Sequence, residues 1–260
     1  MNERVAFITG ATSGIGAAFA RHFAKEGYDL IITGLPSDDG AASIEELKKK
    51  HHVNIEMLYA EFSNEDDMSK LEDIIKSNDK IEVLVNNAGF GFDQPFLQNK
   101  IGNIENMIKV HITAPVRFIY AALPNMIRGK KGTIINLSSL SSFMPVPKNS
   151  MYSATKLFNN SFMESLHISY RNKGIKVQVL CPGFVRTNFH AKNGTNQLEH
   201  KIKGILRWMQ PDKVVEISIR NLIRKNKVIV VPGLRNRIVK FLFSILPQGL
   251  YYNLATKYLQ

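Results

Sequence analysis

The chain has 260 residues, 44% hydrophobic and 22% charged, and a formal net charge of +12 at pH 7. This length and composition allow a sizeable core and argue against intrinsic disorder. The single cysteine, Cys181, excludes an intrachain disulfide framework and suits a reducing compartment. No charge-free run of eighteen apolar residues and no targeting signal occur, so we expect a cytoplasmic protein without a membrane span.

Short apolar runs rich in β-branched residues alternate with longer helical patterns. The runs are nearly continuous, which is typical of strands buried on both faces of a sheet. This order predicts one doubly wound α/β domain over residues 1–233, with about seven parallel strands flanked by helices. The strands are predicted at residues 5–9, 30–33, 55–59, 83–86, 133–137, 177–181 and 228–231, and the helices at 15–26, 41–51, 65–77, 101–128, 150–173 and 212–226.

The first strand runs into a glycine-rich turn, TGATSGIG, at residues 9–16. Glycines allow positive φ and let a phosphate approach the backbone, and the start of the next helix offers free N–H groups. Because the turn follows a strand and opens a helix, we expect it to bind a dinucleotide. The binding residues are expected to be Gly10, Thr12, Ser13, Gly14, Ile15 and Gly16.

A tyrosine and a lysine stand four positions apart in the sequence MYSATK, residues 151–156. On a helix this spacing places Tyr152 and Lys156 on one face. A free phenol has a pKa of about 10, and a nearby positive charge lowers it. By itself the pair also fits an ordinary surface contact.

Four motifs occur in a characteristic order: TGATSGIG, NNAG at residues 86–89, the serine run before YSATK, and PGFVRT at residues 182–187. Over about residues 4–232 the chain therefore resembles the short-chain dehydrogenases/reductases. The resemblance implies a Rossmann-like domain that binds a nicotinamide cofactor. It also implies hydride transfer between that cofactor and a carbonyl/alcohol pair, and no metal site is expected.

The resemblance also implies roles for individual residues. Tyr152 would exchange a proton with the substrate oxygen, while Lys156 would lower the pKa of the phenol and hold the nicotinamide ribose. Ser139, thirteen positions before the tyrosine, would hydrogen-bond the substrate oxygen, with Ser138 as the alternative. The other cofactor contacts that the resemblance implies are Glu61, Asn87, Ala88, Gly89, Pro182, Gly183, Val185 and Thr187.

One position departs from the family pattern. His111 stands where many relatives have an asparagine that supports a water linked to the catalytic lysine. Our hypothesis is that His111 relays protons and makes activity sensitive to pH between about 6 and 7. The alternative is a neutral histidine packed beside the sheet.

The second strand bears on the choice of cofactor. It ends Thr33-Gly34-Leu35, without the acidic residue that would bind the ribose hydroxyls of NAD(H) and repel a 2′-phosphate. NADP(H) is therefore favoured over NAD(H). NAD(H) stays open, because Leu35 replaces the arginine frequent in NADP-preferring relatives and two acids, Asp38 and Asp39, lie close by.

Substrate contacts are expected from Ser139, Phe143 and Phe184, with residues 187–210 as a lid. Aromatic and aliphatic side chains gather in this part of the sequence. They favour a hydrophobic ketone or alcohol, such as a steroid-like or fatty-acyl-derived compound.

Residues 234–260 mix basic and apolar side chains and are predicted to form a helical, amphipathic extension packed on the same domain. Such an extension can rest on a membrane surface, cover the cleft or form a subunit contact. We expect a homo-oligomer, and no nucleic-acid partner, since no module signature accompanies the charge. Two other function classes remain open: a catalytically silent dinucleotide-binding regulator and a membrane-associated scaffold.

Overall fold

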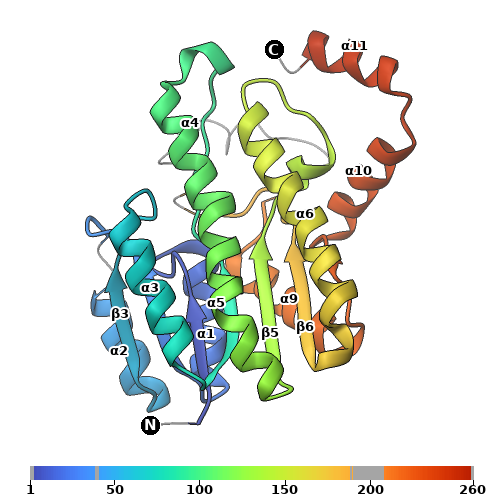
Figure 1. Ribbon diagram of the computed structural model, residues 1–260. Coiled ribbons are helices and arrows are strands. Elements are labelled where there is room, and N and C mark those ends of the chain that lie inside the picture. Colours follow the sequence, from blue (N-terminus) through green and yellow to red (C-terminus); the bar gives the residue numbers. More distant parts are fainter. Residues whose placement is uncertain (1–2, 39–40, 188, 190–207, 259–260) are drawn as a thin grey trace.

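The computed structural model describes residues 3–38, 41–187, 189 and 208–258 of the protein. Across these ranges, seven parallel strands form one sheet in the order β3-β2-β1-β4-β5-β6-β7, which confirms the predicted fold class (Figure 1). The strand order reverses between β1 and β4, the place where open α/β sheets bind ligands. The strands are β1 (Val5–Ile8), β2 (Asp29–Gly34), β3 (Ile55–Tyr59), β4 (Ile81–Asn86), β5 (Gly132–Leu137), β6 (Ile175–Leu180) and β7 (Ile229–Val230).

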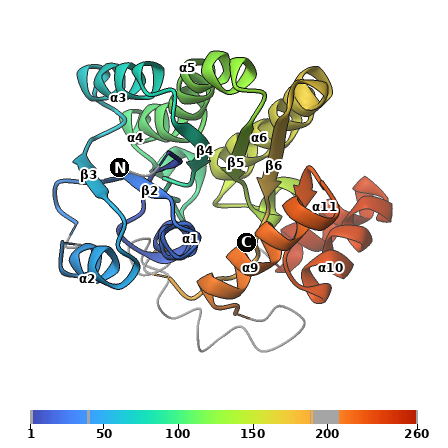
Figure 2. The same ribbon diagram turned by 90° about the horizontal axis from the view of Figure 1, so that it is seen from below.

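Helices cover both faces of the sheet. Seen from below, α3, α4, α5 and α6 lie on one side, and α1, α2 and α9 on the other (Figure 2). Neighbouring residues Phe7 and Ile8 of β1 are both fully buried, in the two opposite cores, which explains the continuous apolar runs. The helices are α1 (Gly14–Lys25), α2 (Ala41–His51), α3 (Glu65–Ser77), α4 (Ile101–Ile108), α5 (Ala114–Arg128), α6 (Ser150–Tyr170), α9 (Pro211–Arg224), α10 (Leu234–Ile245) and α11 (Gln248–Tyr258).

Among the described residues, four short helical segments connect or extend the main elements: η1 (Phe96–Gln98), η2 (Lys109–Thr113), η3 (Leu140–Phe143) and η4 (Arg171–Lys173). The helix predicted over residues 101–128 is interrupted: η2 is a π-helical turn between α4 and α5, and it carries the buried His111. π-helical turns are rare in proteins, and those that occur often lie at functional sites.

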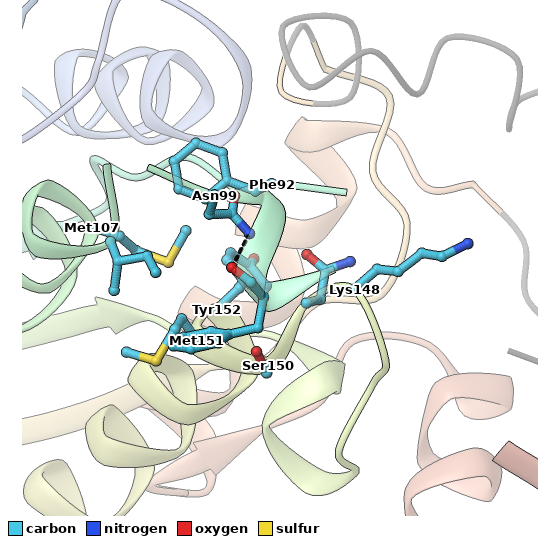
Figure 3. Close-up of a pocket in the computed structure, with 10 residues that line it drawn as sticks. Phe92, Asn99, Met107, Lys148, Ser150, Met151 and Tyr152 are labelled. Atoms are coloured by element: carbon cyan, nitrogen blue, oxygen red, sulfur yellow. Dashed lines mark hydrogen bonds between the residues drawn. The ribbon is translucent and has the colours of Figure 1, made fainter. Parts of the chain in front are cut away.

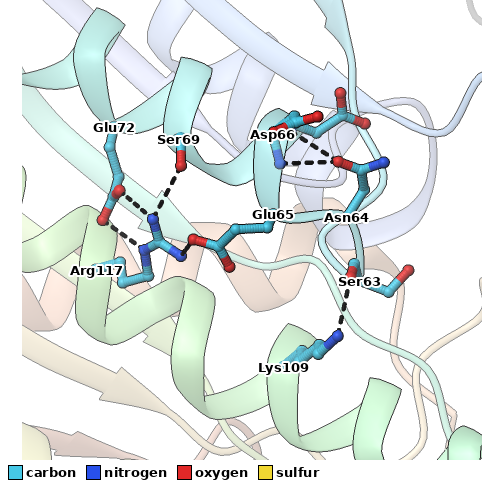
Figure 4. Close-up of polar contacts among 9 residues, drawn as sticks. Ser63, Asn64, Glu65, Asp66, Ser69, Glu72, Lys109 and Arg117 are labelled. Atoms are coloured by element: carbon cyan, nitrogen blue, oxygen red, sulfur yellow. Dashed lines mark hydrogen bonds and ion pairs between the residues drawn. The ribbon is translucent and has the colours of Figure 1, made fainter.

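A polar cluster fastens α5 to α3 (Figure 4). The guanidinium of Arg117 donates from Nε to Glu72 Oε1 at 2.7 Å and is also ion-paired with Glu65. Its Nη2 donates to Ser69 Oγ at 3.2 Å. The two carboxylates raise the pKa of this guanidinium. Because η2 leads directly into α5, the cluster also helps to hold the π-helical turn.

The C-terminal extension forms α10 and α11, at the edge of the molecule beyond α6 and α9 (Figures 1 and 2). Lys240 Nζ lies 4.4 Å from the centre of the Phe143 ring in η3, and the Tyr251 hydroxyl donates to the Pro145 carbonyl. None of the described helices is long and apolar enough to cross a membrane. Of the predicted lid at 187–210, residues 188 and 190–207 lie outside the described residues.

Candidate functional site

The four sequence motifs meet in one cleft. It has a volume of about 730 Å³ and opens where β1, β4, β5 and β6 end, within the range of small-molecule sites. Across the described part of the chain, no group of three His, Cys, Asp or Glu side chains is placed to hold a metal ion. The expected residues that line the cleft are Gly10, Thr12, Ser13, Gly14, Ile15, Glu61, Asn87, Ala88, Gly89, Ser139, Tyr152, Lys156, Pro182, Gly183, Phe184, Val185 and Thr187.

The glycine turn leaves no room for side chains. Gly10 and Gly14 have φ of +63° and +60°, which favours glycine. A Cβ on Gly16 would lie 2.2 Å from the Gly10 carbonyl oxygen, so this residue is needed for packing although it does not line the cleft. The Asn87 side chain donates to that same carbonyl at 2.8 Å and fixes the turn.

The start of α1 fits an anionic ligand. Its N-cap residue, Ser13, makes no side-chain capping bond, so the side chain leaves the first N–H groups of the helix available. The PGFVRT segment returns close to this point, because a Cβ on Gly14 would lie 3.0 Å from Thr187 Cγ2. Helix end, glycine turn and PGFVRT segment together form a cradle suited to the pyrophosphate of a dinucleotide.

Ser139, Tyr152 and Lys156 converge at the carboxyl end of β5. The side chains of Ser139 and Tyr152 are hydrogen-bonded to each other. Lys156 Nζ lies 5.5 Å from the centre of the tyrosine ring and donates to the Leu137 carbonyl at 3.0 Å. Ser138 also lines the cleft, but its hydroxyl donates to the Lys156 carbonyl at 2.8 Å. The geometry therefore favours Ser139 over Ser138 as the serine that meets a substrate oxygen.

The two ionisable groups of this trio have shifted pKa values. Burial raises the pKa of Tyr152 to about 12, against the lowering effect of the Ser139 hydrogen bond. Burial lowers the pKa of Lys156 to about 8. The loss of hydration thus opposes the expected lowering of the phenol pKa by Lys156, and that lowering stays a prediction for the complex with the cofactor. Tyr152 is protonated at neutral pH, the form that donates a proton.

The His111 side chain is buried against the ring of Tyr152. Its Nε2 accepts from the Phe90 N–H at 3.1 Å, and its Nδ1 lies 2.9 Å from Thr155 Oγ1. The imidazole is therefore neutral, with its proton on Nδ1, and it contacts the Tyr152 ring edge-on at 5.6 Å. Burial, with the Lys156 charge, lowers the pKa of His111 well below 6.5. This opposes the expected titration between about 6 and 7 and favours the packed, neutral alternative.

A chain of buried asparagines ties this region to the sheet. The Asn86 side chain donates to Asn136 Oδ1 at 2.8 Å, and the Asn136 side chain donates to Asn159 Oδ1 at 2.8 Å. Asn159 then donates to the His111 carbonyl at 3.0 Å. Asn86 thus joins the end of β4 to β5. The other two amides were missed, because an asparagine in a strand or helix gives no sign of a distant partner.

The substrate side of the cleft agrees in part with expectation. Phe184 lines it and contacts the Trp208 ring at 5.2 Å. Phe143 does not line it and packs instead under Lys240, because η3 turns this side chain toward α10. Met144 and Phe189 line the cleft, and the Phe189 ring lies 6.0 Å from that of Tyr152.

A second, very small cavity of about 10 Å³ adjoins Tyr152 (Figure 3). Its apolar part is formed by Phe92, Met107 and Met151, which gather around the tyrosine. Its volume suits about one water molecule. Lys148 also lines this cavity, so Tyr152 is not its sole ionisable residue.

The opposite end of the cleft contains the carboxylate of Asp38, which the sequence placed only near the second strand. Asp38 Oδ2 accepts from Thr12 Oγ1 at 2.8 Å and from the Leu35 N–H at 3.0 Å. The carboxylate therefore lies at the end of β2, beside Gly34. This is the place where an acidic residue selects for ribose hydroxyls.

Comparison with known proteins agrees with this geometry. The family model for short chain dehydrogenases matches residues 4–198. The human very-long-chain 3-oxoacyl-CoA reductase is 34% identical over 186 residues, 70% of this chain and 59% of that protein. The chain thus matches less than two thirds of the length of that relative.

Solved structures give the same result over nearly the whole chain. A short-chain dehydrogenase from Sphingobium yanoikuyae in complex with NADPH is 27% identical, with a TM-score of 0.82, covering 95% of this chain and 97% of that one. The bulky-bulky ketone specific alcohol dehydrogenase from Comamonas testosteroni is 26% identical, with a TM-score of 0.79, covering 96% and 97%.

Proposed function

The chain belongs to the short-chain dehydrogenase family, and from this premise we propose that it is a nicotinamide-dependent oxidoreductase that reduces a hydrophobic ketone to a secondary alcohol. The observation that carries the proposal is the convergence of Ser139, Tyr152 and Lys156 in the same cleft as the glycine turn. A regulator without catalysis leaves this convergence unexplained.

The chemistry follows from the positions of these side chains. A reduced nicotinamide, when bound, supplies the hydride that adds to the carbonyl carbon. Ser139 and Tyr152 hold the carbonyl oxygen, and the protonated phenol transfers its proton to that oxygen as negative charge develops. The Lys156 ammonium, 5.5 Å from the tyrosine ring, stabilises the phenolate that remains.

For the cofactor, NADP(H) is favoured. The missing acid at residues 33–35 and the NADPH bound in the Sphingobium relative support this choice. NAD(H) is a second candidate on one specific observation. The Asp38 carboxylate, held by Thr12 and Leu35 at the end of β2, would repel a 2′-phosphate.

For the substrate, the lining of the cleft supports a bulky apolar compound. Met144, Phe184 and Phe189 give the side next to Tyr152 an apolar character. The names of two relatives, a very-long-chain 3-oxoacyl-CoA reductase and a bulky-bulky ketone specific alcohol dehydrogenase, support the same substrate class. Fatty-acyl-derived and steroid-like ketones are therefore the substrates to try first.

We also propose that the protein self-associates. Three large apolar side chains on the outer faces of α5 and α6 support this: Tyr120 is 81% exposed, Leu157 54% and Ile168 73%. Exposed apolar groups on neighbouring helices are typical of subunit contacts. Light scattering should give a mass above that of one chain, and Ile168→Ser should lower it; a monomer in both cases would contradict this.

A coupled binding and turnover assay tests the proposed function. NADPH and NADH are each mixed with the protein and a panel of apolar ketones, while cofactor absorbance and cofactor binding are followed separately. Consumption of either cofactor with at least one ketone, lost in Ser139→Ala, is the expected result. Tight binding without consumption for any ketone would instead support the regulator.

A further inference from the structure

The outward side of α10 carries a continuous apolar stripe. Its members recur at the spacing of one helical face, and each is at least 45% exposed. Scattered exposed apolar side chains are normal on a protein surface, whereas a contiguous group marks an interaction site. The outer stripe consists of Leu234, Ile238, Phe241, Leu242 and Ile245.

The stripe is fixed in place by the opposite side of the same helix. Asn236 is buried and donates to the Pro232 carbonyl at 2.7 Å. Lys240 covers the Phe143 ring, and the Phe243 ring contacts that of Tyr251 at 5.3 Å. Since the inner side already packs on the domain, the outer stripe faces away from it.

Charge indicates what covers the stripe. Residues 234–260 contain four basic side chains and no acidic one, in a chain of net charge +12. Arg235 and Arg237 are exposed and flank the stripe on either side of the helix. A second copy of the chain would bring the same positive charge to this contact. An anionic lipid surface offers opposite charge and an apolar layer together.

We infer that the outer stripe of α10 docks the protein on the surface of an anionic lipid bilayer. The apolar side chains enter the boundary between headgroups and acyl chains, and the flanking arginines meet the lipid phosphates. The attachment is peripheral, which agrees with the lack of a membrane-spanning helix among the described residues.

This docking also places the cleft close to the lipid. The Tyr251 hydroxyl of α11 is bonded to the Pro145 carbonyl, and the neighbouring residues Met144 and Val146 line the cleft. A Cβ on Gly183, another lining residue, would lie 2.9 Å from Asn236 of α10. A lipid-soluble substrate would thus have a short path from the bilayer to the cleft.

Co-sedimentation of the full chain with vesicles tests the inference without any assay of activity. One set of vesicles contains phosphatidylcholine alone, and the other contains phosphatidylcholine and phosphatidylglycerol in equal parts. We expect binding to the mixed vesicles only, weakened by added salt. Ile245→Ser should lower the partition coefficient about tenfold, and Arg237→Gln about fivefold on mixed vesicles.

A matched control separates the stripe from general stickiness. Ile223 of α9 is 72% exposed and lies outside the stripe, so Ile223→Ser should bind vesicles like the wild type. Thermal unfolding of each variant checks that it folds. The inference is overturned if the wild type stays in solution with mixed vesicles, or if Ile245→Ser binds equally well. It is also overturned if Ile245→Ser lowers the mass of an oligomer and leaves vesicle binding unchanged, because the stripe would then be a subunit contact.

Discussion

His111 stands where many relatives have an asparagine, and it stays neutral at the pH values at which a free histidine takes up a proton. The imidazole bridges the Phe90 N–H and Thr155 Oγ1, and that hydroxyl donates to the Tyr152 carbonyl at 2.9 Å. His111 is thus a positioning residue that fixes the start of α6 against η2. A proton added to Nε2 would break the bond to Phe90.

Replacing His111 by asparagine tests this role through pH. Because the native pKa is well below 6.5, the pH–rate profile between about 6 and 7 should be unchanged in His111→Asn. As the pH falls, His111 is protonated in the unfolded chain before it is protonated in the folded protein. The free energy of unfolding of the wild type therefore falls below about pH 6.5. The variant should lack this contribution, worth about 1.4 kcal/mol per pH unit. Urea unfolding at several pH values measures it, and a shifted rate profile would restore the relay hypothesis.

Asp38 allows a second test at a single residue. Asp38→Asn keeps an oxygen that can accept from Thr12 and Leu35 and removes only the charge. The ratio of kcat/KM for NADPH to that for NADH should rise about fivefold or more. Asp73→Asn, an equal charge change on the exposed side of α3, should leave the ratio unchanged. An unchanged ratio in Asp38→Asn would show that the carboxylate does not select the cofactor.

Among the elements, the interruption between α4 and α5 is the main departure from the sequence prediction. The apolar pattern of residues 101–128 fits one helix, and nothing local marks a π-helical turn at η2. The turn is stabilised by distant groups: Asn159 of α6 donates to the His111 carbonyl, and Asn136 of β5 holds Asn159. The periodicity of apolar residues reports only on neighbours along the chain, so it cannot predict contacts between residues this far apart.

The asparagine chain should matter for stability as well as position. Asn136→Ala leaves a donor of Asn86 and an acceptor of Asn159 buried without this partner. We expect the free energy of unfolding to fall by about 2 kcal/mol or more. Asn125→Ala removes one hydrogen bond near the surface, to the Lys76 carbonyl, and should cost about 1 kcal/mol or less. Equal effects in urea unfolding would contradict a special role for the buried chain.

For the molecule as a whole, two features could be predicted from the sequence. One is the doubly wound parallel sheet, and the other is that four motifs far apart in the chain form one site. Continuous apolar runs required a sheet buried on both faces, and the i, i+4 spacing placed Tyr152 and Lys156 on one side of α6. Burial was the missing quantity. It raises the pKa of Tyr152 and lowers the pKa values of Lys156 and His111.

The most direct test follows the hydride itself. NADPH or NADH with deuterium at the transferable position is incubated with the protein and an apolar ketone, and the product is examined by mass spectrometry and NMR. We expect one deuterium on the carbinol carbon, and Tyr152→Phe should slow its transfer about 100-fold or more while cofactor binding persists. An alcohol product without deuterium, or equal transfer by Tyr152→Phe, would contradict it.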